Sequence, residues 1–300
     1  MDLSVEIEGI HFKNPIVTAS GPLGFGDEFF KYVSPGIIGG FTSKTVTPKP
    51  VTGNMPPRLV YIQNGLLNSI GLQNPGVDLF IQKTAPFLPE KCVRIISVGG
   101  ENPEDFADVT RKVEKFADMI EVNLSCPNVG GKVIVSDSQL TKEILSGCKA
   151  MTKKPLIAKL SLDLDVIRQS QIAIDSGIKI VNIGNSIQGA KFNFKTGKPF
   201  LKNVKGGLSG PAFMPIALWK VYQVKEAFED LTVIGLGGVT KAEDVMEYAI
   251  AGASIVEIGT QAMIDPKSIQ KIIEDLKNML EALKLDFKEV VNVSHRGGFR

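Results

Sequence analysis

Short β-branched apolar runs alternate along the 300 residues with amphipathic stretches of helical length. The apolar runs predict eight strands, at residues 15–19, 40–44, 93–97, 119–123, 156–160, 178–183, 232–236 and 254–258. Helices are predicted between most of them, including residues 103–117, 138–151, 165–176, 242–251 and 266–285. Repeated strand-then-helix order implies parallel pairing, and eight repeats fit an α/β fold of the closed (β/α)8 type, the TIM barrel. A doubly wound sheet is the alternative.

Two segments interrupt the alternation. Residues 46–76 are rich in Pro, Gly and Asn, and residues 185–211 mix Gly, Lys, Asn and Phe. Each follows a predicted strand, and insertions at the C-terminal ends of barrel strands are where substrate loops are built. We therefore expect a single domain over residues 1–300, with both insertions forming walls of an active site at the C-terminal face.

Charge and cysteine content narrow the class of protein. Lys and Arg number 34 against 32 Asp and Glu, so the net charge of +2 offers no global attraction to nucleic acid or to a membrane. The three cysteines are widely spaced, which argues against a disulfide framework. The N-terminus has no signal-peptide pattern, and no uncharged apolar run reaches about 18 residues. These features predict a cytoplasmic protein.

The residues that end the predicted strands, or directly follow them, are mostly polar, cationic or glycine. In a barrel they converge on one rim and suit a flat, polar, anionic ligand. Because none is acidic, a metal site is not expected. They are Ala19, Ser20, Lys44, Thr45, Ser97, Asn123, Lys159, Asn185, Ser186, Gly237, Gly238, Gly259 and Thr260.

Glycines follow the seventh and eighth predicted strands, as Gly237-Gly238 and Gly259 before Thr260. This is where barrels bind phosphate through backbone N–H groups. Tight turns that need glycine are the alternative explanation.

Lys44 and Lys159 end the second and fifth predicted strands, where a partly desolvated ammonium needs an anion. One use of Lys159 is to stabilise negative charge at the N1/O2 edge of a reduced flavin, with Lys44 near both flavin and substrate. A Schiff base with a carbonyl substrate is a second possibility, and solvated rim lysines are a third.

Cys126 lies in the hexapeptide Asn-Leu-Ser-Cys-Pro-Asn, directly after a buried strand. The thiol is either catalytic or a small apolar filler.

The segment 64–76 is rich in carboxamides, which present donor and acceptor side by side and suit the edge of a pyrimidine. Asn and Gly are also ordinary turn residues, so this segment alone does not distinguish a pyrimidine-binding loop from a turn.

Taken together, six motifs resemble the class 1 dihydroorotate dehydrogenases, over residues 4 to about 265. They are Asn-Pro-Ile-Val-Thr-Ala-Ser-Gly at 14–21, Ser-Lys-Thr at 43–45, Asn-Ser-Ile-Gly-Leu-Gln-Asn-Pro-Gly at 68–76, Asn-Leu-Ser-Cys-Pro-Asn at 123–128, Gly-Gly-Leu-Ser-Gly-Pro at 206–211 and Gly-Gly-Val at 237–239. Cys126 falls where this class carries its catalytic base, whereas the membrane-associated class 2 carries serine. The motifs at 43–47 and 71–76 are more similar to type B, which is NAD-linked, than to the fumarate-using type A.

The resemblance implies oxidation of dihydroorotate to orotate in pyrimidine biosynthesis by an FMN flavoprotein. Cys126 would take the C5 proton while hydride leaves C6 for flavin N5, with Lys44 and Lys159 also in catalytic positions. The residues implied to hold FMN are Ala19, Ser20, Lys44, Thr45, Asn123, Lys159, Gly210, Gly237, Gly238, Gly259 and Thr260. Those implied to hold substrate are Lys44, Asn68, Gly71, Leu72, Asn123, Asn128, Asn185 and Ser186.

The resemblance also implies a partner subunit that carries FAD and a [2Fe-2S] cluster, and a homodimer of this chain within a heterotetramer. Two segments depart from the family pattern. The loop after Asn128 lacks the longer Gly-rich sequence of type B, and the sequence of residues 294–300 does not match the family pattern. The alternative functions are an FMN-dependent dihydropyrimidine dehydrogenase, a non-redox lyase or aldolase that uses Lys159 as a Schiff base, and a silent scaffold. Asn128 favours the orotate function.

Overall fold

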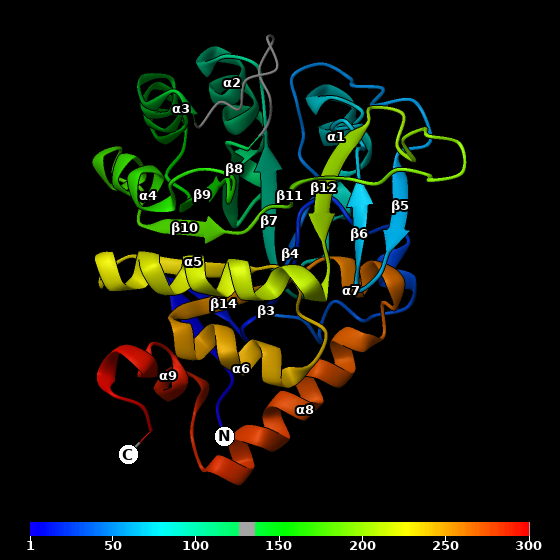
Figure 1. Ribbon diagram of the computed structural model, residues 1–300. Helices are drawn as coiled ribbons and strands as arrows, with labels where there is room; N and C mark the ends of the chain where they lie inside the picture. Colours follow the sequence, from blue (N-terminus) through cyan, green and yellow to red (C-terminus); the bar gives the residue numbers. More distant parts are fainter. Residues whose placement is uncertain (126–135, 300) are drawn as a thin grey trace.

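The structure is a computed structural model that describes residues 1–125 and 136–299. Eight parallel strands close into a barrel in the order β10-β13-β14-β3-β4-β7-β8-β9 (Figure 1). The closed barrel confirms the predicted fold and excludes the doubly wound sheet. The strands are β3 (Ile16–Thr18), β4 (Gly40–Thr42), β7 (Val93–Val98), β8 (Met119–Asn123), β9 (Leu156–Leu160), β10 (Ile180–Ile183), β13 (Thr232–Leu236) and β14 (Ala253–Ile258).

Helices cover the outside of the barrel (Figure 1). Side chains at the N-caps start three of them: Asn102, Asp137 and Asp165 each accept hydrogen bonds from backbone N–H groups of the first turn. The helices are α1 (Val77–Lys83), α2 (Pro103–Val113), α3 (Ser138–Met151), α4 (Val166–Asp175), α5 (Met214–Ala227), α6 (Ala242–Ala251), α7 (Thr260–Ile264), α8 (Ser268–Leu283) and α9 (Phe287–Val290). Short 3-10 turns lie at Phe29–Lys31, Ala85–Phe87, Glu114–Phe116, Pro211–Phe213 and Val293–Arg296.

Several helical segments differ from the predicted ranges. The predicted helix at 103–117 ends as α2 at Val113 and continues as a 3-10 turn. Helices α1, α7 and α9 lie outside the predicted ranges, and so does α5, the longest of these four. The apolar residues of α5 are spread around the helix, with Ile216 and Trp219 exposed, so it lacks a clear 3.6-residue periodicity.

The inside of the barrel is sorted into layers. An apolar cluster fills its N-terminal half and is closed off by the hairpin of β1 (Val5–Ile7) and β2 (Ile10–Phe12). Inward positions recur every second residue along a strand. This cluster includes Met119, Ile157, Ile180 and Ile255, which come from four different strands. Two positions further along the same four strands, the inward side chains are polar or charged: Glu121, Lys159, Asn182 and Glu257. A charged layer therefore lies between the apolar cluster and the rim.

The two insertions pair with each other. Strands β5 (Leu59–Ile62) and β6 (Gly65–Asn68) come from the first insertion, and β11 (Ile187–Ala190) and β12 (Lys205–Ser209) from the second. They form an antiparallel sheet in the order β11-β12-β6-β5, drawn beside α1 in Figure 1. Because both insertions follow barrel strands, this sheet stands at the C-terminal face. The single-domain organisation stays a prediction.

Across residues 1–125 and 136–299, no helix is long and apolar enough to cross a membrane. The cytoplasmic location stays a prediction.

The hairpin that closes the barrel gives a test of stability. Phe12 is 1% exposed inside the barrel, so we expect Phe12→Ala to lower the free energy of unfolding by about 3–5 kcal/mol. Phe87, which is 81% exposed, supplies the matched control, and Phe87→Ala should change it by less than about 0.5 kcal/mol. Urea unfolding followed by circular dichroism measures both, and equal losses would show that Phe12 does not seal the barrel.

Candidate active site

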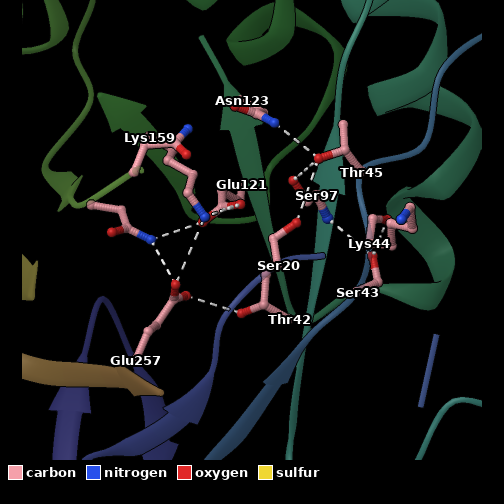
Figure 2. A network of polar contacts seen from close by, with 12 residues as sticks. Ser20, Thr42, Ser43, Lys44, Thr45, Ser97, Glu121, Asn123, Lys159 and Glu257 are labelled. Carbon is pink, nitrogen blue, oxygen red and sulfur yellow. Dashed lines mark hydrogen bonds and ion pairs between the residues drawn. The ribbon is translucent and has the colours of Figure 1, made fainter. Parts of the chain in front are cut away.

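Four polar side chains from neighbouring strand ends meet at the rim (Figure 2). The Thr45 hydroxyl oxygen lies 3.0 Å from Ser97 Oγ and 3.4 Å from Ser20 Oγ. Asn123 Nδ2 donates to the same Thr45 oxygen at 3.0 Å. The structure thus brings together three residues predicted for FMN, namely Ser20, Thr45 and Asn123, with Ser97 from the predicted rim.

The rim network is incomplete on the side of Asn123. Its Oδ1 is buried and has no hydrogen-bond partner among the described residues, and the same holds for Ser125 Oγ. Unpaired buried polar atoms cost free energy and are uncommon in native structures. A buried acceptor without a partner suits the N–H group of a polar ring.

Lys44 follows β4 and is half-buried, with its backbone N–H donating to Gly24 O at 2.8 Å. Burial, with a further contribution from the positive charge of Arg58, lowers the pKa of the Lys44 ammonium. An anionic ligand beside Lys44 would reverse this shift. The position therefore favours a ligand that carries a carboxylate or phosphate.

Lys159 lies one layer below the rim and is paired with two carboxylates. Its Nζ is 3.4 Å from Glu121 Oε1 and 3.9 Å from Glu257 Oε2, and all three side chains are almost fully buried (Figure 2). Asn182 Nδ2 donates to Glu121 Oε2 at 2.9 Å and to Glu257 Oε2 at 3.0 Å. The Lys159 ammonium is therefore held inside the barrel rather than solvated at its edge.

Glu121, Asn182 and Glu257 were not among the predicted site residues, because they lie within the strands rather than at the strand ends. The sequence does contain a signal, because each of the three is a polar residue within a mostly apolar strand, at a position that faces the inside of the barrel. Burial raises the pKa of Glu257 to about 7, Lys159 opposes this shift and Glu121 adds to it.

The glycines after β13 and β14 lie where the backbone leaves little room. Gly237 and Gly238 have φ of 134° and 77°, and a Cβ on Gly238 would lie 2.9 Å from Met214 N. A Cβ on Gly259 would approach Ala19 Cβ to 3.2 Å, and Thr260 Oγ1 donates to Ser209 Oγ at 2.8 Å. The turn itself requires Gly237 and Gly238, and the bare backbone also leaves N–H groups approachable.

Residues predicted for the substrate divide into two groups. Asn68 Nδ2 donates to Gly207 O at 3.2 Å, and a Cβ on Gly207 would collide with Ser186. Asn68 and Ser186, with its neighbour Asn185, are thus close to one another across β12. Gly210, which was predicted for FMN rather than for the substrate, directly follows β12, and a Cβ there would lie 2.6 Å from Gly65 Cα.

Gly71 and Leu72 form the second group. Both have positive φ, of 74° and 52°, and Gly71 packs against Asn54. Within the part of the chain that the structure describes, no hydrogen bond joins them to the rim network. Their place beside the substrate stays a prediction.

Cys126 and Asn128 lie outside the described residues. The two other cysteines are buried, and burial raises the pKa of Cys92 to about 12 and that of Cys148 to about 11. Both thiols therefore stay protonated at neutral pH. Cys126 remains the candidate for a reactive thiol.

The chain matches the family model described as dihydroorotate dehydrogenase over residues 2–280. It is 40% identical over 286 residues to the "Dihydroorotate dehydrogenase B (NAD(+)), catalytic subunit" of Pelobacter propionicus, covering 93% of this chain and 94% of the relative. It is also 40% identical over 304 residues to a protein of Aquifex aeolicus provisionally named dihydroorotate dehydrogenase A (fumarate), covering 99% of each. The ligand-free crystal structure of the dihydroorotate dehydrogenase of Eimeria tenella has a TM-score of 0.83 at 21% identity, covering 98% of this chain and 92% of the other.

The structural likeness at this low identity concerns the fold alone, whereas the family match extends over nearly the whole chain. It includes the strand ends that form the rim and the strands that carry the charged layer. On the strength of that match and of relatives that share 40% of their residues over almost their full length, this chain belongs to the dihydroorotate dehydrogenase family.

Proposed function

We propose that this chain oxidises dihydroorotate to orotate in pyrimidine biosynthesis, as the catalytic subunit of an NAD-linked enzyme. The observation that carries the proposal is the rim at Thr45 and Asn123, built from four strand ends above a paired lysine, in a member of the dihydroorotate dehydrogenase family. Lys44 supports it, since a half-buried cation favours a substrate with a carboxylate.

The residues present fit FMN as cofactor. The buried acceptor of Asn123 has no partner among the described residues, and Lys159 supplies a cation beneath the rim. FMN, when bound, accepts the hydride that leaves C6 of the substrate. The residues that would hold it are Ala19, Ser20, Lys44, Thr45, Asn123, Lys159, Gly210, Gly237, Gly238, Gly259 and Thr260.

In the proposed reaction Cys126 accepts the proton from C5 of dihydroorotate. Lys44 binds the carboxylate of the substrate, and the carboxamides polarise its ring carbonyls, which stabilises the charge that develops as the proton leaves. The carboxamide and backbone groups proposed to bind the ring are Asn68, Gly71, Leu72, Asn123, Asn128, Asn185 and Ser186.

The proposed electron acceptor is NAD, reached through a partner subunit that carries FAD and a [2Fe-2S] cluster, with two copies of each chain in a heterotetramer. The name of the Pelobacter relative, a catalytic subunit, supports a partner. The Aquifex relative has the same identity and a name that specifies fumarate, so the choice of acceptor needs a direct measurement.

A Schiff-base function of Lys159 is disfavoured by its surroundings. Amine nucleophiles must be neutral and reachable, whereas Lys159 Nζ lies between two buried carboxylates. That environment stabilises the ammonium form.

The first prediction about the proposed reaction concerns Cys126. We expect Cys126→Ser to retain FMN but to reduce the flavin roughly a hundredfold or more slowly at neutral pH, because a hydroxyl is far harder to deprotonate than a thiol. Stopped-flow absorbance with dihydroorotate measures the rate. Cys92→Ser, which directly precedes β7 at the N-terminal end of the barrel, is the control, and its flavin should be reduced at the wild-type rate. A wild-type rate in Cys126→Ser would refute the role of the thiol.

A second prediction separates the two acceptors. The isolated chain should be reduced normally by dihydroorotate and should pass electrons slowly to NAD, because the proposed partner carries the intermediate carriers. Steady-state assays with NAD and with fumarate test this on the same preparation. Rapid turnover with NAD in the absence of any partner, or with fumarate, would show that the type B assignment is wrong.

A third prediction concerns Lys44. The Lys44→Met variant should bind orotate on the order of tenfold to a hundredfold more weakly, as expected for a lost hydrogen bond between charged groups. Because burial lowers the pKa of Lys44, wild-type affinity should fall with rising pH earlier than for an ordinary lysine. Flavin absorbance during orotate titration reports both, with the exposed Lys198→Met as control. Unchanged affinity and pH profile in Lys44→Met would exclude the contact.

A further inference from the structure

The charged layer inside the barrel holds three ionisable side chains in a dry environment. Glu121 and Glu257 are 0% and 1% exposed, and Lys159 is 3% exposed. With all three ionised the layer would carry one net negative charge. Burying an unbalanced charge is costly, so such a site takes up a proton when it can.

Within residues 1–125 and 136–299, the neighbours of the layer supply no second buried cation. In strand register, Glu257 is opposite Val17, Glu121 is opposite Ser97, and Asn182 is opposite both Ile234 and Lys159. From β4, Thr42 Oγ1 contacts Glu257 Oε1 at 3.1 Å. Among the described residues, one other charged side chain is buried, that of Asp244 in α6. It is an anion, not a cation, and accepts a hydrogen bond from Thr240 N.

Geometry indicates which carboxylate takes the proton. The Lys159 ammonium is closer to Glu121, at 3.4 Å, than to Glu257, at 3.9 Å, so Glu257 is the carboxylate that the ammonium neutralises less. A protonated Glu257 also has an acceptor at hand, because the Thr42 hydroxyl can accept as well as donate at the same 3.1 Å contact. Burial and the nearby Glu121 both favour the neutral acid at Glu257.

We propose that Glu121 and Glu257 share one proton and act as positioning residues for Lys159, holding its ammonium beneath the cofactor and coupling the reduction potential of the flavin to pH. The inference rests on the proposed function, since it takes FMN as the group above Lys159. With the proton bound the layer is neutral. When the proton is released to water, the layer becomes negative and disfavours the added electron density of a reduced flavin.

Four variants test the shared proton: Glu257→Gln, Glu121→Gln, the double variant, and Glu226→Gln on the exposed face of α5 as the matched control. Glutamine keeps the shape and hydrogen-bonding capacity of a protonated glutamate. Either single variant leaves one carboxylate opposite Lys159, so the layer should stay neutral without a proton. The double variant leaves the ammonium unbalanced.

The first measurement needs no cofactor. In infrared difference spectra of wild type minus Glu257→Gln, we expect the carbonyl stretch of a protonated carboxylic acid at pH 6, shifted in heavy water and lost by pH 9. The spectrum of the Glu121→Gln variant itself should lack this band, as should that of Glu257→Gln. The spectrum of the Glu226→Gln control should keep it. Absence of the band from the wild type at pH 6, or its persistence in both single variants, would overturn the shared proton.

The second measurement uses the FMN-loaded chain. Its midpoint potential should fall more steeply with pH above about 7 in the wild type and in Glu226→Gln than in either single variant. The double variant should have a higher potential than the single variants across the pH range. Identical pH dependence in all variants would refute the coupling. A chain that never binds FMN would instead refute the proposed function, and the infrared result would still decide the proton.

Discussion

The alternation of side chains along each parallel strand is the constraint on which the rest of this molecule depends. Every second residue of a strand faces the closed interior. Along these inward positions the side chains change from apolar at the N-terminal end to charged in the middle and polar at the rim. The opposite parity packs against the helices in one continuous outer core. Four strands, β8, β9, β10 and β14, contribute to the charged layer, and its geometry therefore requires that the barrel be closed.

Much of the fold could be predicted from sequence because the signals are local. The eight barrel strands and the helices α3 and α4 follow from short patterns along the chain. The sheet of the two insertions could not be found in this way, since Asn68 and Gly207 pair across 139 residues. Helix α5 was missed for a different reason, because its apolar residues do not gather on one side.

The candidate site shows the same division. Ser20, Thr45 and Asn123 were found because strand ends in a barrel must converge, which is a property of the fold rather than of any residue. Glu121 and Glu257 were missed because they lie one layer deeper than the strand ends. Their pairing with Lys159 joins different strands, so it becomes visible only in the folded barrel. The roles of Cys126 and Asn128 depend on the family resemblance, since both lie outside the described residues.

The antiparallel sheet of β11, β12, β6 and β5 ties the two insertions into one wall. Strand β12 contacts β6 through backbone hydrogen bonds, so Asn68 and Ser186 share a scaffold although they belong to different loops. A residue inserted within β6 or β12 would shift the pairing of the other strand. The two insertions therefore form a single structural unit, in which a change to one of these strands moves the side chains that the other presents.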